Sequence, residues 1–131
     1  MAYAERTTVP VEQTINEIRK LVAKYGGEQF VFGVAEDRLL VGFTKEERQV
    51  RFQVRQDTKD GQGNMRLARA LLLALKAKLE VVASGIAVFE DEFLGNIVLP
   101  EGGLVSQQVK PALQAAYSGK PMPALLPDYS S

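Results

Sequence analysis

The strongest helical pattern in the chain covers residues 65–83, MRLARALLLALKAKLEVVA. Leucines recur there at helical spacing, and the alanines between them keep the helix propensity high. Leu72, Leu73 and Val81 widen the apolar face beyond one stripe, so this helix needs cover on more than one side. Gly85 follows as a stop signal. We therefore expect the rest of the chain to be arranged around this helix.

A shorter amphipathic helix is predicted near the N-terminus. Pro10 suits a first helical turn because its φ is preset and its missing N–H is not needed there, and Glu12 favours the positive end of the dipole. The helix is therefore expected to begin at Val9 and to end at Gly26, and residues 1–8 are expected to form an arm. Its apolar stripe consists of Val11, Ile15, Ile18, Val22 and Tyr25.

Three short strands are predicted between the two helices, over residues 29–34, 38–44 and 48–56. The polar connectors between them are short enough for hairpins, so the sheet should be an antiparallel meander. Alternation is clearest in the third strand. The apolar side of this sheet is expected to pack against the long helix. That side carries Phe30, Phe32, Val34, Leu39, Val41, Phe43, Val50, Phe52 and Val54.

The opposite side of the sheet is polar and basic. Gly33 and Gly42 carry no side chain on this side, so a ligand or another backbone can approach closely. Val31 and Leu40 also lie there, which predicts partial cover by the C-terminal segment or by a second subunit. A plain solvated sheet face is the alternative interpretation. The polar residues on this side are Arg38, Thr44, Gln49, Arg51, Gln53 and Arg55.

Two more helices and a tail are predicted after the long helix. Ile86, Phe89 and Phe93 are spaced for a short helix over residues 86–96, and residues 97–99 either finish it or form a small strand. A last helix covers residues 104–117, and Pro111 should kink or split it. Its inward residues are expected to be Val105, Val109, Leu113 and Tyr117.

The proline-containing tail, residues 118–131, is expected to be extended, with Met122, Leu125 and Leu126 packed across the domain. The predicted fold is therefore α+β: a helix, a three-stranded meander, a long central helix and C-terminal helices. A length of 131 residues suits a single domain, residues 1–131.

Composition removes several kinds of chemistry. The chain has no Cys and no His, which excludes thiolate chemistry, the commonest metal ligand and the commonest general base. The carboxylates of Glu90, Asp91 and Glu92 are adjacent on a predicted helix, so they point in different directions and cannot share one ion. The G-x-G of residues 61–63 lacks the lysine of a phosphate loop. We expect no catalytic residue, cofactor or metal. No membrane span is expected either, because the apolar runs are too short.

The charges of this neutral chain are distributed unevenly. Residues 38–78 contain ten Lys or Arg against four Asp or Glu, and the remainder contains six against twelve. Pairing across the fold is the simpler interpretation, and a basic patch for nucleic acid is the alternative. The expected contact surface is the outward side of the third strand together with the start of the long helix. Its candidate residues are Arg38, Arg51, Arg55, Arg66 and Arg69.

Several segments resemble a family of small uncharacterised proteins found in phages and prophages. The similar segments are YAERT, VPVE, KYGGEQFVFG, RALLLALKAKLEVVASGI, FEDEFLGNIVLP and SGKPMPALLP. Family members carry a longer insert with Arg and Pro where this chain has only residues 57–64, DTKDGQGN. The resemblance implies a phage origin and action in the cytoplasm of a host bacterium. It brings no catalytic motif, because the family has no assigned activity.

The predicted order of elements is also similar to that of double-stranded RNA-binding domains, and in part to the core of single-strand annealing proteins. Such similarity of topology does not carry function. Arg66 and Arg69 match the basic cluster of the RNA-binding family only thinly. Aromatic residues that could stack on single-stranded bases are not evident either, because the phenylalanines are predicted to point inward.

Three functional hypotheses follow. The first is a non-enzymatic accessory protein of a phage that contacts nucleic acid in replication or recombination. The second is a protein-interaction module that inhibits or adapts a host factor through its acidic helical half. The third, an enzyme, is disfavoured by the missing His and Cys. A homo-oligomer, most simply a dimer, is also expected, because the sheet has open edges and the long helix is widely apolar.

Overall fold

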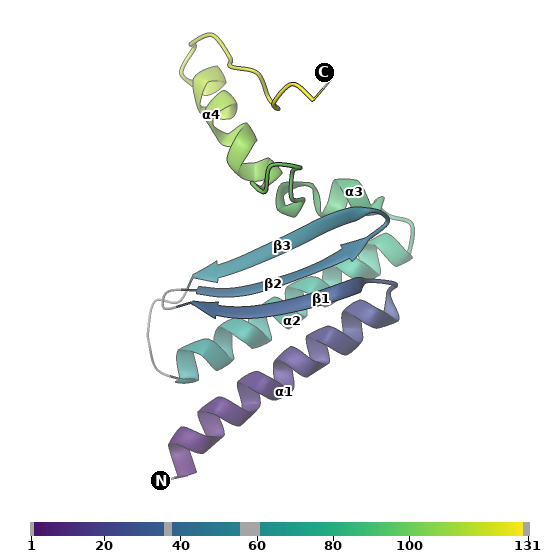
Figure 1. Cartoon of the computed structure of the whole chain (residues 1–131), viewed down its shortest axis with the longest axis vertical. Coiled ribbons are helices and arrows are strands. Elements are labelled where there is room, and N and C mark those ends of the chain that lie inside the picture. The colour runs from purple at the N-terminus through teal and green to yellow at the C-terminus, as the bar shows by residue number, and fades with distance from the viewer. Residues whose placement is uncertain (1, 36–37, 56–60, 130–131) are drawn as a thin grey trace.

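The computed structural model describes residues 2–35, 38–55 and 61–129, with side chains from residues 11–35, 38–55 and 64–129 (Figure 1). A three-stranded antiparallel sheet lies against two long helices, and the C-terminal part of the chain extends from one end of this body. The predicted α+β fold is confirmed. Its elements are α1 (Ala2–Lys24), β1 (Glu28–Ala35), β2 (Arg38–Lys45), β3 (Arg48–Arg55), α2 (Gly61–Ala83), α3 (Phe89–Glu92), the 3-10 helix η1 (Leu94–Asn96) and α4 (Val105–Tyr117).

The sheet has the order β1-β2-β3, and each strand agrees with its prediction to within one residue at either end. The turn from β2 to β3 contains Glu46 and Glu47, which both have positive φ, at 50° and 65°. Two such residues form the tight hairpin turn whose twist matches the strands. Every residue from Arg38 to Lys45 therefore faces one residue of β3, without a bulge.

The core lies between the inner face of the sheet and the two helices α1 and α2, which run side by side. Val41, Phe43 and Val50 of the sheet are fully buried there. Apolar residues of both helices complete the cluster, because their stripes at helical spacing face the same layer. The expectation that the long helix packs on the apolar face of the sheet is confirmed for Val41, Phe43 and Val50, but Val34 is 63% and Phe32 36% exposed, so these two predicted inward residues are not buried. The helical core residues are Ile15, Ile18, Val22, Leu71, Leu75 and Leu79.

Segments α3 and η1 close one end of this core. Phe93 is fully buried, and its ring lies 4.8 Å from that of Phe89 and 6.1 Å from those of Phe43 and Phe52, measured between centroids. The next residues run beside the edge of β3, where the Val98 amide donates a hydrogen bond to the Gln49 carbonyl over 2.8 Å. The first half of the β3 edge is therefore covered.

Helix α4 projects away from this body, and the tail returns beside it (Figure 1). The prediction that Leu113 and Tyr117 point inward is wrong, because these residues are 54% and 88% exposed. Helical periodicity identifies an apolar face but not the element that covers it. The tail residues Met122, Leu125 and Leu126 are also 44–55% exposed, so their predicted packing is wrong as well. The helix continues through Pro111 and is not split.

Three helices begin elsewhere than predicted. Helix α1 begins at Ala2, so the predicted arm is helical, and Pro10 does not mark its start. The alanines and the charged residues of the arm have high helix propensity. Helix α2 begins at Gly61, four residues before its predicted start at residue 65, and residues 57–60 of the polar segment before it lie outside the described residues.

Helix α3 begins at Phe89, and Ile86 is 78% exposed. The Ile86 amide donates back to the Val81 carbonyl over 3.1 Å, and Gly85 has a φ of 82°. This is the hydrogen-bond pattern of a glycine-terminated helix. The stop predicted at Gly85 is therefore confirmed, and Ile86 belongs to the end of α2, not to the next helix.

Candidate nucleic-acid interface

The side of the sheet away from α1 and α2, here called the outer face, is not covered by either helix (Figure 1). Successive residues of a strand point to opposite sides, so the register between strands decides which outward side chains are neighbours. Val31, on the edge strand β1, is 50% exposed, so no described segment buries this apolar residue fully. The outer face comprises Val31, Gly33, Ala35, Arg38, Leu40, Gly42, Thr44, Gln49, Arg51, Gln53 and Arg55.

Arg38 and Arg55, here called the arginine pair, are direct partners across the β2–β3 ladder. Arg38 Nη1 donates a hydrogen bond to Gln53 Oε1 over 3.0 Å, and these three side chains line a depression of about 230 Å³. Like charges directly opposite each other destabilise a sheet. An anion in the depression would relieve that repulsion and accept hydrogen bonds from both guanidinium groups.

The β2–β3 turn creates the arginine pair, and the sequence contained the signal for it. Because the turn has two residues, Lys45 pairs with Arg48. Moving away from the turn one residue at a time along both strands then pairs Arg38 with Arg55. The individual arginines were predicted as candidates, but their direct opposition follows only from the register.

Arg51 lies on the same face but is held by the chain itself. Its Nη2 donates to the Gly102 carbonyl over 2.9 Å, and its Nε is buried with no acceptor in the described part of the chain. Arg51 therefore fastens the loop between residue 99 and α4 to the sheet. The C-terminal segment therefore contacts the outer face at Arg51, while Val31 stays half exposed.

Arg66 and Arg69 belong to a different surface. Helix α2 packs on the inner side of the sheet, and Arg69 Nη1 forms an ion pair with Glu17 Oε2 of α1 at 2.7 Å. A second depression, of about 240 Å³, lies there between α1 and α2 and is lined by Met65 and Arg66 among others. The prediction of one surface that joins the outer side of β3 to the start of α2 is therefore wrong, because the sheet lies between the two sets.

Several cations of the basic central segment are paired with carboxylates from other elements. Arg48 Nε lies 2.9 Å from Glu90 Oε2, and Lys78 Nζ lies 3.1 Å from Glu92 Oε2. These two carboxylates pair with separate cations. Ion pairs between elements therefore explain much of the charge pattern, and they partly neutralise the acidic helical half.

On the outer face, arginines outnumber carboxylates among the described residues. Its outward positions from Val31 to Arg55 in the described strands carry three arginines and no carboxylate. Glu28 lies opposite Thr44, at the end of the sheet away from the arginine pair. The face is therefore a cationic strip that ends at the depression between Arg38 and Arg55.

Comparison of the chain with protein-family models, with curated proteins and with solved structures gave no match. Within the described ranges, no helix combines the length and apolar character needed to cross a membrane.

Proposed function

We propose that this protein is a small non-enzymatic accessory protein that binds nucleic acid through the outer face of its sheet. The observation that carries the proposal is the direct opposition of Arg38 and Arg55 beside a depression, on a face whose outward positions from Val31 to Arg55 in the described strands hold three arginines and no carboxylate. The resemblance to phage and prophage proteins supports a setting in the cytoplasm of a host bacterium.

Phosphate is the part of a nucleic acid that this geometry suits best. The guanidinium group presents a planar fork of donors that matches two phosphate oxygens, and its charge persists at every physiological pH. The Gln53 side chain accepts from Arg38 and thereby limits the orientations of that fork. Gly33 keeps the face low beside Leu40, so a backbone can pass close to the strands there, whereas the Val31 side chain fills the space at Gly42.

Contacts of this kind fix the position of a protein on nucleic acid but do not read bases. We therefore expect weak sequence preference and strong dependence on salt, because each neutralised phosphate releases condensed counterions. The described phenylalanines of the sheet belong to the core or pack against it, apart from Phe32, which is 36% exposed. Stacking on aromatic rings is therefore not part of the proposed mode of binding.

The test is fluorescence anisotropy with labelled single- and double-stranded DNA and RNA at several salt concentrations. The variant is Arg38→Gln with Arg55→Gln, which keeps polar side chains of similar length. Loss of two phosphate contacts should weaken binding about tenfold or more at low salt and reduce the slope of log K against log salt by roughly two.

A matched control removes two charges elsewhere. Lys20 and Lys76 are exposed on α1 and α2, away from the outer face, and Lys20→Gln with Lys76→Gln changes the net charge equally. Equal weakening by both double variants would mean that net charge, not the arginine pair, determines binding. No binding by the unmodified protein at low salt would remove this function and favour the protein-interaction module instead.

A further inference from the structure

Helix α4 rises from a loop that is fastened to the outer face at Arg51. Arg51 Nη2 donates to the Gly102 carbonyl over 2.9 Å, and the Asn96 side chain donates to the Arg51 carbonyl over 3.0 Å. The helix begins at Val105, three residues after Gly102, and projects away from the body (Figure 1). A polymer that leaves the outer face at Arg51 therefore meets the loop at the base of α4.

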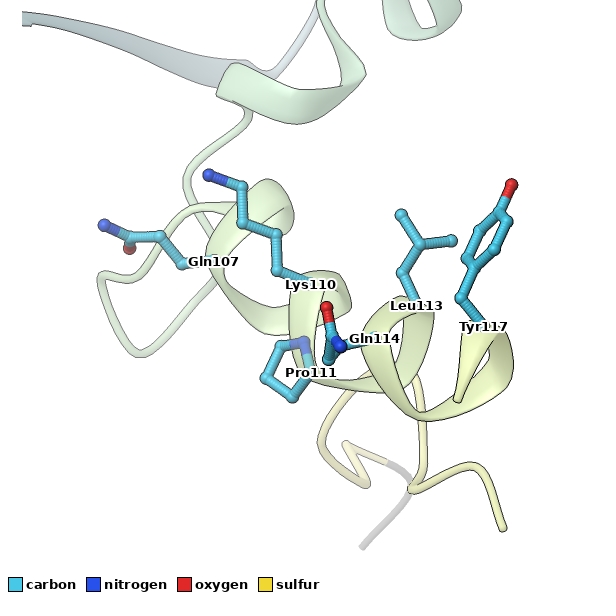
Figure 2. A pocket seen from close by; sticks show the side chains of 6 residues that line it. All are labelled: Gln107, Lys110, Pro111, Leu113, Gln114 and Tyr117. Atoms are coloured by element: carbon cyan, nitrogen blue, oxygen red, sulfur yellow. The ribbon is translucent and has the colours of Figure 1, made fainter. Parts of the chain in front are cut away.

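One side of α4 carries the most exposed aromatic ring in the described part of the chain. Lys110, Leu113 and Tyr117 project from this side (Figure 2). Tyr117 is 88% exposed, so both faces of its ring are open to solvent, whereas Ala112 of the same helix is fully buried. Lys110 lies two helical turns, about 10 Å, before Tyr117. An exposed ring and a cation therefore share one side of the helix.

The charge of α4 and the tail favours an anionic partner. Residues 102–127 contain two cations, Lys110 and Lys120, and no Asp or Glu. Both lysines are exposed, and Lys120 follows the C-terminal turn, where a cation offsets the partial negative charge of the helix end. The flanking carboxylates, those of Glu101 and Asp128, both have partners of their own.

These features together match a single-stranded nucleic acid. Proteins bind single strands with cations along the phosphates and with aromatic rings on which unpaired bases stack. The outer face supplies arginines but no aromatic ring among its described residues, and α4 supplies the ring that it lacks. Tyr117 was missed as a stacking residue because its helical spacing predicts an inward position.

We infer that Tyr117 stacks on an unpaired base of a single strand whose backbone continues from the outer face, with Lys110 and Lys120 against its phosphates. This inference rests on the proposed function and names the class of nucleic acid that the protein prefers. The bases of a duplex stack on one another, so a duplex gains only the phosphate contacts. Single strands of DNA or RNA should therefore bind more tightly than duplexes of the same sequence. Every base has a face that can stack, so the weak sequence preference is kept.

Fluorescence of a Tyr117→Trp variant tests the stacking contact directly. The chain has no tryptophan, so the new indole is a single reporter. Its emission should be quenched by a single-stranded oligonucleotide, and much less by the duplex or by a strand of the same length without bases. The control is Leu73→Trp, which places an indole at a 63% exposed position of α2 and should not be quenched.

Affinity measurements separate stacking from simple apolar contact. Tyr117→Phe keeps the ring and should bind single strands as the unmodified protein does. Tyr117→Leu keeps an apolar side chain without a ring and should weaken that binding about fivefold or more, with little effect on duplex binding. The salt slope should be unchanged in both variants because no charge is lost, whereas Lys110→Gln with Lys120→Gln should lower it by roughly one to two.

The outcomes distinguish this inference from the proposed function. Binding detected by anisotropy, with an unchanged emission of Tyr117→Trp or an unaffected affinity of Tyr117→Leu, would overturn the stacking contact and leave the outer face as a phosphate site. The exposed side of α4 would then be a surface for a protein partner. Equal affinity for single strands and duplexes would also overturn the inference. Absence of binding to any nucleic acid would overturn both the inference and the proposed function.

Discussion

Substitution of Arg55 by Gln should stabilise the fold although it removes a charged residue from a strand. Arg55 faces Arg38 directly across the β2–β3 ladder. The guanidinium groups end flexible side chains, so we take a separation of about 8 Å in water. Coulomb repulsion is then roughly 0.5 kcal/mol, and physiological salt reduces it to about 0.2 kcal/mol. For a domain of this size, that gain raises the melting temperature by about 1 °C.

Substitution of Arg48 by Gln on the same strand should have the opposite effect. Arg48 Nε lies 2.9 Å from Glu90 Oε2, and both side chains are about half exposed. Exposed ion pairs contribute about 0.2–1 kcal/mol, so this variant should melt about 1–3 °C lower. The two variants make the same chemical change and lose the same charge. Only the charge that each arginine faces differs between them.

Thermal melts of the two variants at low salt and at about 1 M salt provide the assay. The melting temperatures should separate in opposite directions at low salt and converge at high salt, because both effects are electrostatic. A loss of stability in Arg55→Gln as large as that in Arg48→Gln would refute the reasoning. It would mean that Arg55 is held by a favourable contact and is not part of a repulsive pair.

Three further predictions concern the body and the tail. Phe93→Ala should lower the free energy of unfolding by about 3–5 kcal/mol in denaturant melts, since Phe93 is fully buried among three other rings. Glu46→Asn with Glu47→Gly should raise it by about 1 kcal/mol, because both positions have positive φ, and a smaller or negative change would contradict that turn geometry. Partial burial and the Glu101 carboxylate raise the pKa of Tyr129 to about 12, from 10.0. The Tyr129–Glu101 hydrogen bond should therefore be present below pH 10 and lost as the pH rises through about 12. The tyrosinate absorbance of Tyr129→Phe should lack the step near pH 12 that the unmodified protein shows.

The sequence predicted the body of the fold well because each of its elements has a strong period of its own. Alternation from Gln49 to Arg55 identified β3 and its two faces, and the leucines of α2 identified the side that packs on the sheet. These patterns are read from neighbouring residues and need no knowledge of the rest of the molecule.

The errors arose where position depends on tertiary structure. Leu113 and Tyr117 have the spacing of an inward stripe, but α4 does not lie on the body. Arg66 follows β3 closely in the sequence, yet α2 lies on the inner side of the sheet. Proximity along the chain therefore suggested a single basic surface that the layers of the fold divide in two.

The candidate site was predictable in part for the same reason. Periodicity alone identified Arg51 and Arg55 as outward residues. Which cation faces Arg55 depends on the hairpin register. The hydrogen bond that Arg51 donates to the Gly102 carbonyl depends on a loop about fifty residues further along the chain. Neither fact is expressed in local periodicity.

The most direct test of the account is the salt dependence of nucleic-acid binding by the unmodified protein and by Arg38→Gln with Arg55→Gln. We predict measurable binding at low salt, similar affinities for unrelated sequences, and a salt slope that falls by roughly two in the double variant. Binding that keeps its full salt slope in the double variant would contradict the claim that the arginine pair contacts phosphate.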